Sequence, residues 1–400
     1  MNLWKCPSAR EFMQDVCQTV RIHDSHVCLV MPGLGINTFV QEFTAYAENY
    51  LSEIIPIEIG KHNDPKACFL SAFQTASAIP GLEAVMDCCA QSTYLLLVVS
   101  KDVADPKGMI ADLCQTIARL SKQKKDANAT LLWRLIVVLP AHIPWPDETP
   151  SLKVNLWWGQ IHPSDTEYAI EHCLRESIPS ALHEWEYLWL YSLCQGLAVI
   201  DPMIADTIFH QLPTCLEEIE TLFDNHPVRK LSPEAQKAII RLDTLGNIPQ
   251  DQPKDGDVRL LWSLGALDMR ENVSAMLHPA AYVAANRISS LERLVVQGQI
   301  KVYFPIVQEV HGFLCSQLQK SCGDHWNKYD PHFQTINDEI GALPKYMSLY
   351  LKGKHDPELY ELACSWRAIR NSLAHGTMIQ CQTAIDAHKK YRNLVEKCKG

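Results

Sequence analysis

The sequence of 400 residues lacks any long apolar run, and none reaches the roughly 18 residues that a membrane-spanning helix needs. Residues 1–10 also lack the apolar core of a secretory signal peptide. Internal repeats and low-complexity tracts are missing, while apolar and charged residues make up 47% and 20% of the chain, as in ordinary globular proteins. We therefore expect a cytoplasmic protein of two or three globular domains that does not contact a membrane.

Paired metal-ligand spacings are missing as well. The chain contains 15 cysteines but no Cys-x2-Cys pair, so the spacing disfavours a structural zinc site. Scattered thiols in a cytoplasmic chain of this size are expected to stay reduced. We predict neither a bound metal nor another cofactor.

Positive charge is scarce except near the C-terminus. The formal net charge is −10, yet residues 281–400 contain 15 Lys and Arg against 11 Asp and Glu, and residues 1–280 contain 21 against 35. A locally basic end on an acidic chain suits a ligand that carries phosphates. An ordinary solvated surface that binds no ligand would give the same composition.

Continuous apolar runs alternate with segments of helical length over residues 1–165. Such runs, unlike alternating ones, indicate strands that are buried on both faces. Strand, helix and strand at this spacing predict an α/β domain with a parallel sheet. The expected strands are 27–31, 51–59, 94–99, 135–139 and 156–158, and the expected helices include 37–50 and 107–121.

Helical patterns replace the strand pattern after residue 165. A second domain, 166–279, is predicted from helices at 166–177, 183–197, 202–223 and 231–245, a Pro/Asp/Gly-rich loop at 247–257, and a segment at 258–279 that resembles a winged helix. The third domain, 280–400, is predicted as an up-and-down α-helical bundle. Its helices are expected at 280–315, with a potential break at Phe304-Pro305, and at 331–351, 356–375 and 379–397.

The first expected strand leads into a loop with Gly33 and Gly35 and then into a helix. A phosphate-binding loop reads G-x4-G-K-[ST] in this place, and laying Thr38 on its last position puts Asn37 where the lysine belongs. Asparagine lacks the charge that neutralises the transferred phosphate, and no acid directly follows strand 94–99 to hold magnesium. The region resembles a degenerate P-loop NTPase module of the STAND or AAA type. That resemblance implies a fold kept for regulation or partner contact rather than for ATP hydrolysis. Whether Gly33, Gly35, Asn37 and Thr38 bind a nucleotide stays open. A generic α/β domain with a glycine-rich turn fits the same residues.

Polar residues share one side of the expected helix 356–375. Arg367, Asn371 and His375 are four residues apart, Arg370 lies beside them, and Gly376 is placed to end the helix. The opposite side carries the apolar residues Leu362, Trp366, Ile369 and Leu373.

The segment from Arg370 to His375 reads R-N-x3-H. HEPN domains carry an R-x4-6-H motif near the end of a late helix, so residues 280–400 resemble a HEPN domain in both helix number and motif placement. The resemblance implies metal-independent RNA cleavage, in which the ribose 2′-hydroxyl attacks the adjacent phosphate. Arg370 would hold the phosphate charge, His375 would transfer protons, and Asn371 would orient one of these groups. An acid on the first helix often accompanies the motif, and Glu292 is the candidate.

The same resemblance implies partners. HEPN families usually build the site from two bundles, so it implies a homodimer through the C-terminal bundle, an RNA substrate such as tRNA, and a regulatory protein partner. Proteins of this architecture typically act as toxins or in antiphage defence. Four other hypotheses stay open: a His375 that only caps its helix, a bundle that binds RNA or nucleotide without cutting, a non-catalytic assembly or adaptor subunit, and a working ATPase switch.

Overall fold

The computed structural model describes residues 2–22, 25–51, 53–59, 93–103, 105–111, 114–115, 117–118, 133–176, 182–246, 248, 253, 256–270, 274–323, 326–327, 339–351 and 355–399. Its contacts divide the chain into two compact units. One comprises residues 2–165 and 230–281, and the other comprises 166–229 and 282–400. The predicted middle segment, 166–279, is therefore shared between them. Among the helices that the structure describes, none is long and apolar enough to cross a membrane.

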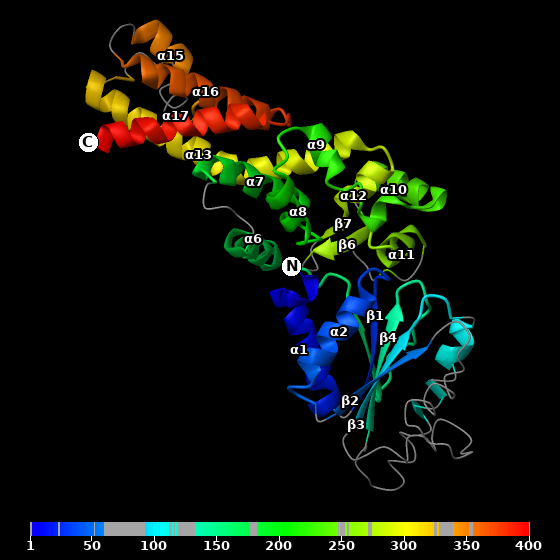
Figure 1. The fold of residues 1–400 in the computed structure, drawn as a ribbon. Helices are drawn as coiled ribbons and strands as arrows, with labels where there is room; N and C mark the ends of the chain where they lie inside the picture. The colour runs from blue at the N-terminus through cyan, green and yellow to red at the C-terminus, as the bar shows by residue number, and fades with distance from the viewer. Residues whose placement is uncertain are drawn as a thin grey trace. The chain divides into compact units, whose positions relative to one another are not determined.

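A parallel five-stranded sheet forms the centre of the first unit (Figure 1). Its order is β2-β3-β4-β1-β5, and the strands are β1 (His26–Met31), β2 (Glu53–Ile59), β3 (Thr93–Val99), β4 (Trp133–Pro140) and β5 (Leu152–Leu156). β1 pairs with β4 on one side and with β5 on the other, and all six of its residues are buried. This confirms the predicted parallel sheet. The fifth strand ends at Leu156, where the prediction began it.

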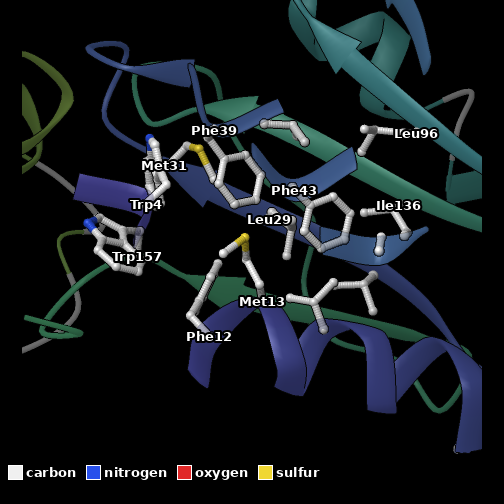
Figure 2. Packing of buried hydrophobic residues seen from close by; sticks show 14 of the residues in the cluster. Trp4, Phe12, Met13, Leu29, Met31, Phe39, Phe43, Leu96, Ile136 and Trp157 are labelled. Carbon is white, nitrogen blue, oxygen red and sulfur yellow. The ribbon is translucent and has the colours of Figure 1, made fainter. Parts of the chain in front are cut away.

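Helices α1 (Pro7–Ile22) and α2 (Ile36–Ala47) pack against this sheet and against each other. Figure 2 shows the core between them, where the rings of Phe39 and Trp157 lie 4.7 and 4.8 Å from the ring of Trp4, centroid to centroid. The helix predicted at 37–50 is α2, and the one predicted at 107–121 is helical at its described residues. α1 was not predicted. Its buried side holds seven residues, Ser8, Ala9, Phe12, Met13, Val16, Cys17 and Val20.

The first unit also contains a helical pair and a hairpin. These are α10 (Pro233–Leu245), α11 (Gly256–Ser263) and the antiparallel strands β6 (Leu267–Arg270) and β7 (Ser274–Leu277). The segment 258–279, which resembles a winged helix in its sequence, contains most of α11 and both strands of this hairpin.

The second unit is helical. The helices of residues 163–229 and 279–399 are α6 (Pro163–Glu176), α7 (Glu184–Leu197), α8 (Ile204–Gln211), α9 (Leu216–Thr221), α12 (Pro279–Ala284), α13 (Ile288–Cys322), α15 (Leu343–Tyr350), α16 (Pro357–Ala374) and α17 (Cys381–Lys399). α13 packs along α7 and α16, and α17 packs along α16 and α7 (Figure 1). The bundle therefore includes α7 as well as helices from the C-terminal segment.

Three helix boundaries differ from the predictions. Pro305 does not break α13, because this residue is exposed and water can hydrate the carbonyl that loses its N–H partner. The break lies instead before α13, near Asn286, whose φ of 53° is left-handed. The helix predicted at 202–223 is divided at Leu212, which has a φ of 51° and precedes a proline. Residues 331–338 lie outside the described residues, and α15 begins only at Leu343.

α7 and α13 approach each other at two glycines. A Cβ atom on Gly298 would lie 2.1 Å from the carbonyl oxygen of Ser192, and one on Gly196 would lie 2.2 Å from that of Leu294. Both obstacles are backbone atoms, so the two helices would have to move apart to admit a methyl group.

We expect Gly298→Ala to lower the free energy of unfolding by about 1–3 kcal/mol, the usual range for an overpacked core. The matched control is Gly312→Ala in the same helix, because a Cβ atom there meets no other atom within 4 Å. Alanine favours helix over glycine, so the control should be neutral or slightly stabilising. Thermal unfolding of the two variants would test this, and equal stability would contradict the close approach.

Candidate functional site

α16 carries the R-N-x3-H motif and buries the side of the helix opposite to it. Asp356 caps the first turn by accepting a 2.9 Å hydrogen bond from the Glu358 N–H, and Pro357 follows at the first helical position. Trp366 is fully buried and donates from its indole nitrogen to the carbonyl oxygen of Ala387 on α17, at 3.1 Å. The apolar arc that the sequence predicted is thus the packed face of α16. Its buried members are Leu362, Trp366, Ile369 and Leu373.

The end of α16 is fixed by a Schellman motif. The N–H of Gly376 donates to the carbonyl of Leu373 at 3.1 Å, and that of Thr377 donates to the carbonyl of Ser372 at 2.8 Å. Gly376 has a φ of 67°, which favours glycine. His375 is the capping residue and its side chain is exposed, so the imidazole is accessible to a ligand. The prediction that Gly376 ends the helix is confirmed.

Arg370 is held by two polar neighbours. Its Nη1 donates to Oδ1 of Asn371 at 3.3 Å, and its Nη2 forms an ion pair with Oε2 of Glu339. The Arg370 side chain is 29% exposed and that of Glu339 is 40% exposed, so the pair lies at the surface. Sequence reasoning did not find Glu339. It is 31 residues from Arg370 and stands in no local pattern with it.

Arg370 and His375 do not face each other within one chain. Five residues along a helix correspond to about 140° of rotation and about 7.5 Å of rise. Among the described residues, no hydrogen bond or ion pair joins these two side chains. One chain therefore presents the cation and the imidazole as separate groups on different sides of the end of α16.

Glu292 lies near the start of α13, one to two turns before the residue of α13 that binds the segment after α16. The segment that leaves α16 is fixed to α13 by Gln299, whose amide accepts from the Ile379 N–H at 2.9 Å and donates to its carbonyl at 3.2 Å. Glu292 precedes Gln299 by seven residues, about 10 Å along the axis. In the described part of the chain the acid that pairs with Arg370 is Glu339, and no hydrogen bond or ion pair joins Glu292 to Arg370 or His375.

The loop after β1 is occupied by another part of its own unit. The N–H of Gly33, which a phosphate-binding loop would offer to a ligand, donates instead to the carbonyl of Ser263 at 3.0 Å. Gly35 has a φ of 84° and begins α2 without a side-chain cap. Asn37 and Thr38 are exposed in the first turn of α2, and that turn contains no acidic residue.

Two residues, Arg259 and Asp268, attach the 256–277 segment to the carboxyl ends of strands. Arg259 donates to the carbonyl of Ala141, just after β4, at 3.0 Å and lies 4.5 Å from the ring centroid of Trp145. Asp268 accepts from the N–H of Gly159, after β5, at 3.2 Å. Open parallel sheets bind ligands at this edge. The hairpin segment covers part of it.

The Asp268 side chain is buried in this contact. Burial raises its pKa to about 7, and the N–H groups of Met269 and Gly159 only partly offset that rise. The hydrogen bond from Met269 measures 2.7 Å. The attachment of the hairpin therefore includes a carboxyl group that is charged or neutral according to pH.

No family model and no curated protein that we compared with the chain matches it.

Proposed function

We propose that the chain is a HEPN-type, metal-independent RNA endonuclease. The helical bundle carries the cleaving motif, and the N-terminal unit is a degenerate NTPase-like domain that regulates it. The observation that carries the proposal is the end of α16, where His375 is exposed and Arg370 and Asn371 are partly exposed, while the apolar side of the same helix is packed. A toxin or antiphage-defence role follows from the architecture by analogy.

The chemistry needs no metal. The ribose 2′-oxygen would form a bond to the adjacent phosphorus as the bond from phosphorus to the 5′-oxygen breaks, leaving a 2′,3′-cyclic phosphate. The 2′-hydroxyl loses its proton to a base and the leaving oxygen gains one, and histidine suits such transfers because imidazole ordinarily titrates near neutral pH. Arg370 would bind the phosphate and the negative charge that develops on its oxygens.

The separation of Arg370 from His375 around the helix axis supports a site shared by two chains. In a homodimer through the bundle, Arg370 of one chain and His375 of the other would act on the same phosphate. Two-fold symmetry would then create two equivalent sites.

The contact between Gly33 and Ser263 favours a regulatory or scaffolding role for the N-terminal unit over ATP hydrolysis. The same contact fits the alternative function, a non-catalytic assembly or adaptor subunit of a defence complex. In that alternative both units serve as binding surfaces for protein or nucleic acid, and no RNA is cut.

Incubation of the protein with total RNA and with tRNA in the presence of EDTA tests the proposal. We expect cleavage by the wild type that leaves 2′,3′-cyclic phosphate ends, and none by His375→Ala. A His375→Ala protein that cuts RNA as fast as the wild type would overturn the assignment of His375 as a catalytic residue. RNA left intact by the wild type, both alone and with candidate partner proteins, would favour the adaptor function.

A further inference from the structure

The guanidinium group that the proposed reaction needs is already bound to an acid. Glu339 contacts Nη2 of Arg370, and Asn371 contacts Nη1. Carboxylate and phosphate compete for the same planar donors of an arginine, because both present pairs of negatively charged oxygens. The Glu339 carboxylate therefore stands where an oxygen of an RNA phosphate would bind.

We propose that Glu339 is a gate on Arg370: its carboxylate occupies the guanidinium in the resting chain, and an RNA phosphate binds by displacing it. This inference rests on the proposed function, since it concerns the same site. The gate would keep cleavage low without a trigger, and any event that moves Glu339 away would release Arg370 for the substrate.

The surroundings of Glu339 suit a side chain that swings on a fixed backbone. The next residue, Ile340, is buried, and so is Leu343 at the start of α15, so the backbone is anchored. The Glu339 side chain is itself 40% exposed, so it can turn into water at small cost. Displacement then needs no unfolding of the bundle.

Gly341 leaves room for the pair. A Cβ atom at this position would lie 3.0 Å from Oε1 of Glu339 and 3.8 Å from Cζ of Arg370. A side chain there would crowd the carboxylate against the guanidinium. The turn from Glu339 to Gly341 thus accommodates the bound arrangement.

Binding of an uncleavable RNA by the full chain tests the gate. The probe is a fluorescein-labelled, single-stranded oligouridine with 2′-O-methyl riboses, which keeps the phosphates but lacks the attacking hydroxyl. We expect Glu339→Gln to bind it about fivefold more tightly than the wild type, the upper range for an exposed ion pair. The gain should vanish in the Arg370→Ala background, because Arg370 is the group that is released.

Glu358→Gln is the matched control. Glu358 lies on α16 and pairs with Lys397 at 2.9 Å, so its replacement also removes one negative charge and releases one cation, but at the other end of the helix. We expect its affinity to stay near that of the wild type. An equal gain in both variants would show a general charge effect and overturn the gate.

Other outcomes are equally decisive. Binding by Glu339→Gln that is absent, unchanged or weaker than that of the wild type overturns the gate. Slower cleavage by Glu339→Gln without tighter binding would also overturn it, and would make Glu339 a positioning residue for Arg370. Tighter binding with no cleavage by any variant supports the gate and counts against the nuclease. Cleavage by the wild type, with no gain in RNA affinity in Glu339→Gln, supports the nuclease and overturns the gate.

Discussion

His375→Ala is expected to lose RNA cleavage by about 10²–10⁴-fold, the usual contribution of a positioned proton-transfer group. Arg370→Ala is expected to lose it by about 10²–10³-fold, the usual contribution of a group that stabilises developing charge. Cleavage is expected to return when the two variants are mixed. The recovery is expected because the two side chains lie about 140° apart on one helix and would serve one site only from different chains. His375 remains in the first variant and Arg370 remains in the second. A dimer of one of each would therefore contain one site with both groups.

The size of the recovery follows from symmetry. A two-fold dimer has two shared sites, and the mixed dimer has one intact site and one that lacks both groups. Random exchange makes half of the dimers mixed, so we expect about a quarter of the wild-type activity. Initial rates of RNA cleavage after subunit exchange, with dimer formation followed by light scattering, would measure it.

Mixing His375→Ala with the double variant Arg370→Ala/His375→Ala is the matched control, since no pairing of those chains restores a histidine. Recovery there would indicate contamination rather than complementation. Dimers of the two single variants that exchange freely but stay inactive would exclude a site shared between chains. The histidine and the arginine would then have to act within one chain.

The strands and the motif helix were predictable because their patterns are local. β1 is buried between two neighbouring strands, so the apolar run Val27 to Met31 reads as a buried parallel strand without any tertiary knowledge. α16 has an apolar arc, an N-cap at Asp356 and a glycine just after its end, and all of these features lie in the short segment from Asp356 to Gly376. Local periodicity and capping were sufficient to place the motif.

The contacts that decide how the candidate sites work were not predictable, because their partners are distant in sequence. Ser263 is 230 residues from Gly33, and nothing around either one marks the hydrogen bond between them. Glu339 is an ordinary surface acid until the fold brings it to Arg370. α7 was predicted as a helix, but its packing on α13 depends on the close approach at Gly196 and Gly298. Such pairings come from the tertiary fold alone.

Pro305 shows how a local rule can fail. Proline inside a helix removes one hydrogen bond and crowds the preceding turn, which is why the sequence indicated a potential break at Phe304-Pro305. α13 continues through it because buried residues on both sides, Val302 and Val307, hold the helix against the bundle. Packing along 35 residues outweighs one missing backbone bond.

Asp268→Asn is expected to stabilise the first unit at pH 8 and to leave its stability unchanged near pH 4. Burial raises the pKa of Asp268 to about 7, against an ordinary value of 3.8. Between these two pH values the folded chain keeps the proton and the unfolded chain has lost it, so stability falls as pH rises through this window. Above pH 7 the buried group is ionised and the full penalty, up to about 4 kcal/mol, is present. Asparagine has nearly the same shape and stays neutral throughout.

Denaturant unfolding of wild type and variant between pH 4 and 8.5 would measure the effect. Only the difference in unfolding free energy between the two proteins isolates Asp268, because other buried groups also make stability depend on pH. Burial lowers the pKa of His26 to about 4, so the stability that depends on this histidine is lost as pH falls, whereas the stability that depends on Asp268 is lost as pH rises. Asp268→Asn leaves His26 in place, so that contribution cancels. A difference that stays constant over the whole range would mean that Asp268 is ionised in the folded chain at every pH tested. The hairpin would then be attached through a stable carboxylate that accepts from the Gly159 and Met269 N–H groups.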